Sequence, residues 1–187
     1  MNEDHQRFCS SPEWAAYLQD VILPSVTRDA DLGEDMLEIG PGPGAATGWL
    51  RHRVKRLTAV ESDADAARRL AEKYAGPGVT VLAGNAAELG YPDESFDSVG
   101  CFTMLHHVPT VTLQNAILAE ALRVLRRGGV LVGSDSLPSD ELHHFHAADT
   151  YNPVEPASFL TRLLTLGYSK ITIVADETMM FVAHKPR

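Results

Sequence analysis

The segment MLEIGPGPGAATGWL, residues 36–50, places three glycines and two prolines within residues 40–44, directly after an apolar run. The apolar run predicts a strand over 35–39, and the residues after the glycines predict a helix over 45–53. A strand that ends in glycines and leads into a helix lets backbone N–H groups approach a ligand without interference from a Cβ atom. The segment therefore predicts an α/β protein with a ligand-binding turn at the carboxyl end of its first strand.

The rest of the chain alternates between apolar, β-branched runs and amphipathic stretches, which is typical of a parallel sheet covered by helices on both faces. The last two strands are joined by only Ala-Asp-Glu, a connection too short for a parallel crossover, so they should form an antiparallel hairpin. The predicted fold is α/β: a Rossmann-like, doubly wound, seven-stranded sheet that is mostly parallel and ends in this antiparallel hairpin. Strands are expected at 35–39, 57–61, 79–83, 95–102, 130–135, 169–174 and 178–184, with helices at 45–53, 64–74, 113–126 and from 159 onward.

A chain of 187 residues, 44% of them hydrophobic, can bury one sizeable core, so a single domain over 1–187 is expected. Residues 1–32 precede the first strand, and Ser11-Pro12-Glu13 is typical of a helix start, so a helical cap is expected there until Pro24 interrupts it. A polar segment over 136–156 breaks the alternation. Long irregular insertions in compact domains usually carry function, so this segment is predicted to be an active-site loop.

The net charge and the composition of the chain indicate which classes of partner it can bind. The formal net charge is −9, which makes the overall field repulsive to phosphate backbones and anionic lipid, so neither nucleic acid nor a membrane is expected as a partner. Apolar runs are shorter than the roughly 20 residues that span a bilayer, and the acidic start MNEDHQRF lacks an export signature, which favours a cytoplasmic location. The cysteines, Cys9 and Cys101, form neither a disulfide framework nor a zinc motif.

The glycine spacing and Glu38 narrow the ligand class. A dinucleotide fingerprint requires G-x-G-x-x-G, whereas here the third glycine comes one residue early and the pattern is E-x-G-x-G-x-G. A glutamate beside a pyrophosphate would be repelled, while Glu38 beside a cationic amine is favourable. The segment therefore favours a cationic ligand without phosphate.

With these residues the chain resembles the class I S-adenosylmethionine-dependent methyltransferases over roughly residues 33–187. In that family the loop wraps the methionine half of S-adenosylmethionine, an acidic residue at the end of the second strand holds the ribose, and a third motif meets the adenine. Here AGNAAEL has Asn85 where the family usually has Asp, and its side-chain carbonyl can still accept from an exocyclic amine. SFDSVGCFTMLHHV resembles the fourth motif, in which Asp97 is interpreted as structural. The cofactor-binding residues implied by the resemblance are Glu38, Gly40, Gly42, Gly44, Glu61, Ser62, Asn85, Ala86 and Phe102.

Methyl transfer needs an acceptor aligned with the sulfonium and, for a hydroxyl acceptor, a base. Histidines follow the fourth and fifth strands, where open α/β sheets place their reacting groups, and we predict His144 as the base, followed by His143 and His107. Asp135 and His144 are a candidate metal pair, and carboxylate ligands favour Mg²⁺ or Mn²⁺.

The acceptor class is less defined. The N-P-P-Y type signature of amide and base N-methyltransferases is absent after the fourth strand, so O-methylation is favoured. The compact chain and its His-rich segment resemble O-methyltransferases acting on sugars or polysaccharide precursors, and a small polar metabolite is an equal alternative. In so small a chain a second subunit, in a homodimer, is a further source of pocket residues. An NAD-dependent oxidoreductase and a non-catalytic cofactor-binding scaffold are the competing hypotheses.

Overall fold

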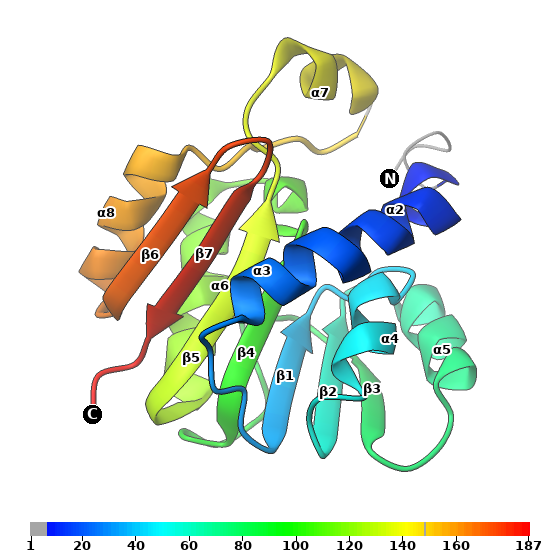
Figure 1. Cartoon of the computed structure of the whole chain (residues 1–187), viewed down its shortest axis with the longest axis vertical. Coiled ribbons are helices and arrows are strands. Elements are labelled where there is room, and N and C mark those ends of the chain that lie inside the picture. The colour runs from blue at the N-terminus through cyan, green and yellow to red at the C-terminus, as the bar shows by residue number, and fades with distance from the viewer. Residues whose placement is uncertain (1–6, 148) are drawn as a thin grey trace.

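Within residues 7–147 and 149–187, which the computed structural model describes, seven strands form one sheet in the order β3-β2-β1-β4-β5-β7-β6 (Figure 1). The expectations that depend on residues 1–6 and on Ala148 lie outside the described residues. Strands β1 to β5 are parallel, and β7 lies antiparallel to both β5 and β6. The predicted fold class is therefore confirmed. The bounds are Asp35–Ile39 (β1), Arg56–Glu61 (β2), Val79–Ala83 (β3), Phe96–Phe102 (β4), Leu125–Asp135 (β5), Ser169–Ala175 (β6) and Met179–His184 (β7).

Strand order reverses between β1 and β4, because the chain runs outward from β1 to β3 and then returns to the other side of β1. In open α/β sheets, ligands bind outside the carboxyl ends of the strands at such a reversal. The fold therefore predicts a site where β1 and β4 end.

Helices cover the two faces of the sheet (Figure 1). On one face, the amino-terminal helices and α4 pack on β1 and β2 through residues such as Ile22, Leu50 and Met36, and on the other α6 and α8 pack through Leu118 and Phe159. The helical bounds are Pro12–Tyr17 (α2), Leu23–Thr27 (α3), Ala45–Leu50 (α4), Ala64–Lys73 (α5), Val111–Val124 (α6), Asp140–Phe145 (α7) and Pro156–Leu166 (α8), with a 3₁₀ turn at Leu105–His107 (η2). No helix within the described ranges is both long and apolar enough to cross a bilayer.

The amino-terminal helix starts as predicted, with the Ser11 hydroxyl accepting a hydrogen bond from the Trp14 N–H at 3.1 Å. The prediction that Pro24 interrupts it was wrong. The chain continues as a π-helical turn over Leu18–Ile22 and then as α3, in which Pro24 occupies the first turn. Proline lacks the N–H that a regular helix would use at this position, and the wider π turn before it changes the backbone pairing and lets the helix continue.

Other parts of the sequence prediction also differ from the structure. The helix expected over 45–53 ends at Leu50, and the strand expected from residue 130 begins at Leu125. The helix expected to reach Arg126 ends at Val124, and Leu125 already belongs to β5. The segment predicted as an irregular loop over 136–156 contains α7, whose first turn is capped by the Ser139 hydroxyl accepting from the Leu142 N–H at 3.1 Å. Short helices with such local caps are hard to separate from polar loops by periodicity alone.

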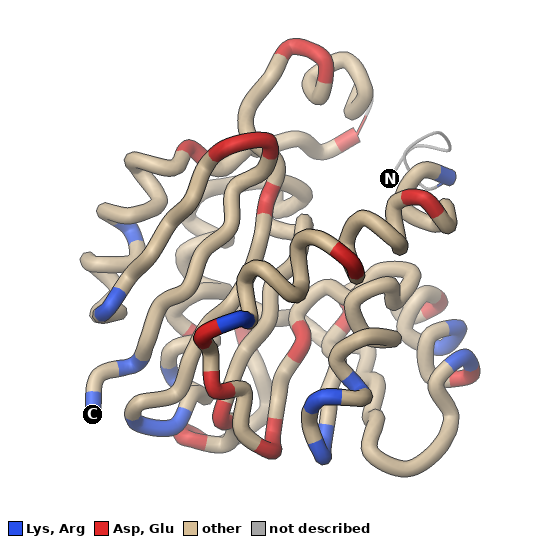
Figure 2. Tube along the Cα trace, viewed as in Figure 1, with Lys and Arg blue, Asp and Glu red and all other residues tan. Residues whose placement is uncertain are grey.

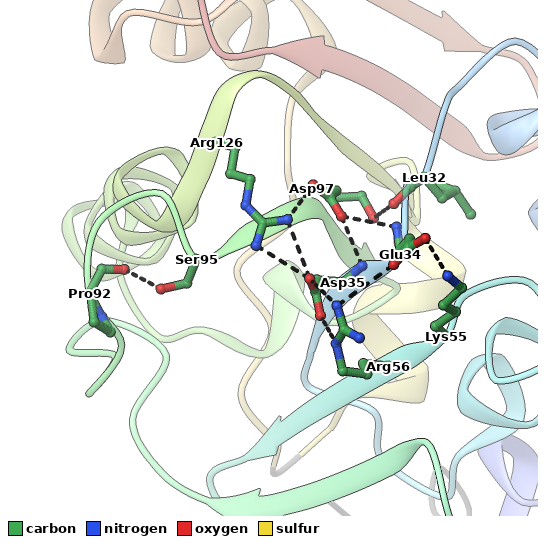
Figure 3. Close-up of polar contacts among 10 residues, drawn as sticks. Leu32, Glu34, Asp35, Lys55, Arg56, Pro92, Ser95, Asp97 and Arg126 are labelled. Atoms are coloured by element: carbon green, nitrogen blue, oxygen red, sulfur yellow. Dashed lines mark hydrogen bonds and ion pairs between the residues drawn. The ribbon is translucent and has the colours of Figure 1, made fainter.

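Asp97 lies at the amino end of β4, at the opposite edge of the sheet from the carboxyl ends (Figure 3). One carboxylate oxygen accepts from the N–H groups of Glu34 and Asp35, both at 2.9 Å, and the other pairs with Arg126. Although burial alone would raise its pKa, the hydrogen bonds from Asp35 and Arg126 hold the pKa of Asp97 below its ordinary value. This confirms the structural interpretation of Asp97.

Candidate active site

A cavity of about 700 Å³ opens where β1, β2 and β4 end, within the range of small-molecule sites, roughly 300–1,000 Å³. Its walls come from the glycine turn, the ends of these strands, the start of α2 and the segment after α7. A smaller cavity of about 170 Å³ shares residues with it and extends toward the end of β3. The residues that line both cavities are Gly40, Ser62, Met104, His107 and Val108.

The glycine turn has a backbone that requires glycine. Gly40, Gly42 and Gly44 have φ of 65°, 53° and 85°, in the left-handed region that side chains with a Cβ rarely adopt. A Cβ on Gly44 would lie 2.3 Å from a methyl carbon of Leu70 in α5, whereas a Cβ on Gly42 would meet nothing within 4 Å. Gly44 therefore lets α5 approach the turn, and Gly42 leaves the cavity side of the turn open.

Glu38 is buried at the cavity wall with 1% exposure, and its carboxylate accepts a hydrogen bond from the Thr47 hydroxyl at 2.7 Å. Burial raises the pKa of Glu38 from 4.5 to about 7, the Thr47 hydrogen bond opposes this, and the charge of Glu61 adds to the rise. A buried carboxylate with so little compensation is stabilised by a nearby cation. The site is therefore suited to a ligand with a positively charged group beside Glu38.

Glu61, at the end of β2, is held by its own chain segment and by the glycine turn. One carboxylate oxygen accepts from the Asp63 N–H at 3.1 Å and the Ser62 hydroxyl at 3.2 Å, and the other accepts from the Gly42 N–H at 3.2 Å. These bonds orient the carboxylate at the cavity wall, where the family resemblance implies a contact with ribose hydroxyls.

The remaining predicted cofactor residues also lie at the two cavities. Asn85 and Ala86 line the smaller cavity, and Phe102 lines the larger one at the end of β4. The Asn85 side-chain oxygen accepts from the Ala87 N–H at 3.0 Å, which fixes the amide in a local turn. The next residue after Phe102, Thr103, has φ of 50° and lines the larger cavity. Such strained residues cluster at functional sites, but sequence reasoning cannot detect them.

The structure separates the three predicted bases. His107 lines both cavities, whereas His143 and His144 lie exposed on α7 and line neither of them. The His144 Nδ1 is 2.6 Å from the Asp140 carbonyl oxygen within the same helix. Of the three, His107 is the one placed to meet an acceptor in the cavity.

Asp135 and His144, the predicted metal pair, are not brought together. Asp135 is fully buried, with one oxygen 2.6 Å from the His106 Nδ1 and the other accepting from the Leu105 N–H at 2.9 Å. The histidine beside Asp135 is therefore His106, because β5 pairs with β4 and η2 follows β4 directly.

Three histidines form a cluster beside the cavity: His106, His107 and His146, each with one possible ligand nitrogen within 4.8 Å of the others. Burial lowers the pKa of His146, which favours its neutral imidazole form. Neither His106 nor His146 is among the bases predicted from the sequence. A signal for His106 is present in the sequence, because His106 follows the fourth predicted strand and Asp135 ends the fifth, and the structure pairs these two strands.

Comparison with known proteins gives one family match and several partial relatives. Residues 37–133 match the family model named Methyltransferase domain. The chain is 30% identical over 128 residues to the phthiotriol/phenolphthiotriol dimycocerosates methyltransferase 1 of Mycobacterium ulcerans, covering 67% of this chain and 46% of that protein. It is 27% identical over 140 residues to a fatty-acid O-methyltransferase of Mycolicibacterium smegmatis, covering 73% of this chain and 50% of that protein.

A similar fold is seen in the crystal structure of an S-adenosylmethionine-dependent methyltransferase from Aquifex aeolicus, with a TM-score of 0.75, 16% identity and 98% of each chain covered. This likeness concerns the fold. The chain spans about half or less of the length of the two curated relatives named above.

Proposed function

The chain belongs to the class I S-adenosylmethionine-dependent methyltransferases, and on that premise we propose that it transfers a methyl group to a hydroxyl of a small molecule. Membership of this family argues against the competing hypothesis that the chain is an NAD-dependent oxidoreductase. S-adenosylmethionine supplies a methyl group already activated on a sulfonium. The protein must bind this donor, exclude water and hold an acceptor in line with it.

The residues of the site fit this donor. Glu38 is a buried carboxylate that a cationic amine would compensate, and the open side of Gly42 lets a ligand approach the backbone. The carboxylate of Glu61 would accept from the ribose hydroxyls. The smaller cavity beside Asn85 and Ala86 would take the adenine. Phe102 and Ser62 would contact the nucleoside between these two ends.

The observation that best supports O-methylation is the position of His107, which lines both cavities. A hydroxyl is a poor nucleophile near neutral pH, and a positioned base contributes roughly 10²–10⁴-fold to its reaction. His107 belongs to the cluster of three imidazoles, so this wall is the part of the cavity equipped to remove a proton. The fatty-acid O-methyltransferase relative supports oxygen as the acceptor atom.

For the acceptor we retain a sugar or small polar metabolite, with no role for nucleic acid. Acidic residues mark α7 and the connection between β6 and β7, at the same end of the sheet as the cavity (Figure 2). Such a rim repels a phosphate backbone. The cavity wall also has apolar members in Trp14 and Met104, so lipid hydroxyls and carboxylates belong among the acceptors to be tested.

A labelled-methyl transfer assay tests the proposal. S-adenosylmethionine labelled at its methyl group is offered with sugars, glycosides, small alcohols, hydroxylated lipids and fatty acids, and products are analysed for O-methyl groups. Binding of S-adenosylhomocysteine is measured separately, with Glu61→Ala expected to weaken it and Glu88→Ala, at an exposed position, as the control. A product labelled on nitrogen or carbon would refute O-methylation. Tight S-adenosylhomocysteine binding without transfer to any acceptor would favour the scaffold hypothesis.

A further inference from the structure

The cluster of His106, His107 and His146 has the composition of a metal site. Two of its members, His106 and His146, are each 3% exposed, and His107 is partly exposed at the cavity wall. Catalytic zinc sites have three protein ligands and a fourth position that is open to water or substrate. The cluster therefore resembles a catalytic site more closely than a closed structural site.

Hydrogen bonds at the outer nitrogens of the two buried histidines support this interpretation. The His106 Nδ1 is 2.6 Å from a carboxylate oxygen of Asp135, and the His146 Nδ1 is 2.7 Å from the Leu142 carbonyl oxygen. Histidines that bind metals almost always donate their other ring N–H to a carboxylate or a backbone carbonyl, which fixes the tautomer and the ring orientation. His106 has a carboxylate partner and His146 has a backbone carbonyl partner. Because each partner is bound through Nδ1, Nε2 is the nitrogen left to bind a metal in both residues.

The backbone that carries the histidines is fixed by further polar contacts. The Asn152 N–H donates to the His106 carbonyl at 2.7 Å, and the Asn152 side chain donates to the Val108 carbonyl at 3.0 Å. The buried Gln114 amide donates to the carbonyls of Leu105 and Asn152, both at 2.9 Å. These bonds tie the segment after α7 to η2, so that His146 is held against His106 and His107.

We propose that His106, His107 and His146 bind one divalent transition-metal ion, with Zn²⁺ as the best match, and that its open position takes the oxygen of the methyl acceptor. Imidazole ligands suit Zn²⁺, Cu²⁺, Fe²⁺ and Ni²⁺, whereas Mg²⁺ prefers oxygen ligands, so this site differs in chemistry from the Mg²⁺ site predicted from the sequence. Two zinc–nitrogen bonds of about 2.1 Å span at most about 4.2 Å. The possible ligand atoms of the three histidines all lie within 4.8 Å of one another, close to the separation that binding to one ion requires.

The role of the ion rests on the proposed function. A metal ion lowers the pKa of a coordinated hydroxyl, so the acceptor would lose its proton to water near neutral pH. The acceptor oxygen would then form the new C–O bond with its lone pair, while the C–S bond breaks and its electron pair remains on sulfur as an uncharged thioether. In this arrangement His107 promotes loss of the proton as a ligand of the ion, whereas without the ion it would accept the proton as the base. The two roles are alternatives, and removal of the ion distinguishes them because it stops methyl transfer only in the first.

Metal titration of the chelator-treated protein tests the site without any assay of activity. We expect Zn²⁺ to bind by calorimetry with one ion per chain, Mg²⁺ to give no comparable binding, and Co²⁺ to give the visible absorption of imidazole coordination. His107→Ala and His146→Ala should each lower Zn²⁺ affinity by at least 100-fold. Asp135→Asn, which changes the outer partner of His106, should lower it by roughly 10–100-fold.

Two control variants separate this cluster from other histidines. His52→Ala removes an exposed imidazole in the turn after α4, and His144→Ala removes the exposed histidine of α7 that was predicted as the base. Both should keep wild-type Zn²⁺ affinity. Unchanged S-adenosylhomocysteine binding shows that each variant is folded, and His107→Gln, at the cavity wall, provides a second variant if His146→Ala does not fold.

Absence of saturable Zn²⁺ and Co²⁺ binding, or equal affinity in the wild type and in both alanine variants of the cluster, would overturn the site. If Zn²⁺ binds but methyl transfer is unaffected by its removal, the role in acceptor activation is wrong and the O-methyltransferase proposal stands. If Zn²⁺ binds and no hydroxyl is methylated, the proposed function fails while the metal site stands.

Discussion

Replacing the buried carboxyl of Glu38 should stabilise the ligand-free protein and weaken ligand binding. The pKa of Glu38 is about 7 in the folded state, against an ordinary value of 4.5. Between pH 4.5 and about 7, the folded state therefore holds a proton on Glu38 that the unfolded state has already released. Stability is therefore lost as pH rises from 4.5 to about 7, and at about 1.4 kcal/mol per pH unit the loss is roughly 3 kcal/mol. Glu38→Gln should remove this loss, since its amide oxygen can still accept from Thr47.

The assay is urea unfolding of the ligand-free wild type and Glu38→Gln at pH 5 and pH 8. The difference in unfolding free energy between the two proteins should shift by about 2–3 kcal/mol in favour of the variant as pH rises, because other titrating groups cancel in the difference. At pH 8 the variant should bind S-adenosylhomocysteine at least about tenfold more weakly, corresponding to about 1.4 kcal/mol. Glu88→Gln, at an exposed position, is the control. Parallel pH profiles of Glu38→Gln and the wild type would refute the reasoning.

Three further substitutions test other parts of the site and the fold. Gly44→Ala should lower the free energy of unfolding by more than about 1 kcal/mol and weaken S-adenosylhomocysteine binding, because φ at this position is 85° and the new methyl group would contact α5. Gly90→Ala, with open space around it, should leave the free energy of urea unfolding close to that of the wild type. Asp97→Asn should lower the free energy of unfolding by about 1–3 kcal/mol near neutral pH, and by less as pH falls through the lowered pKa of Asp97. The affinity for S-adenosylhomocysteine, measured by calorimetry, should be unchanged. A weakened affinity would contradict the structural role of Asp97. His107→Gln should lower turnover by roughly 10²–10⁴-fold while S-adenosylhomocysteine affinity is retained, and wild-type turnover on the true acceptor would exclude His107 from proton removal.

Most of the sheet could be predicted from the sequence because its parallel strands are continuous apolar runs bounded by turn residues. Three cases show where this signal fails. Pro24 has the local chemistry of a helix stop, but tertiary packing of Ile22 and Leu23 in the core keeps the helix going through a π turn. At Leu125 the helix gives way to a strand without a loop. In α7 six polar-rich residues lack enough length for a helical period to be recognised.

The side of the cavity formed by the glycine turn was more predictable than the side formed by the histidines. Glu38, the glycines and Glu61 lie at strand ends, where the order of elements alone places them at one edge of the sheet. The histidines depend on details beyond topology. His146 lies just after α7, and its position follows from how the next residues return to η2 through Asn152. Nothing in the sequence distinguishes it from the exposed His144.

The buried and strand-end carboxylates along this edge explain how the site would orient its ligand. Asp135 is occupied by His106 and backbone N–H groups, and Glu61 receives the Gly42 and Asp63 N–H groups. Among the described residues, Thr47 supplies the hydrogen bonding to Glu38, and burial raises the pKa of this carboxyl to about 7, so a ligand cation lowers the free energy most beside β1. With its amine beside Glu38 and its adenine in the smaller cavity near the end of β3, the donor would have its methyl group directed toward β4 and β5. The histidine cluster stands at the ends of those two strands, which is why the acceptor should enter from the side of α7.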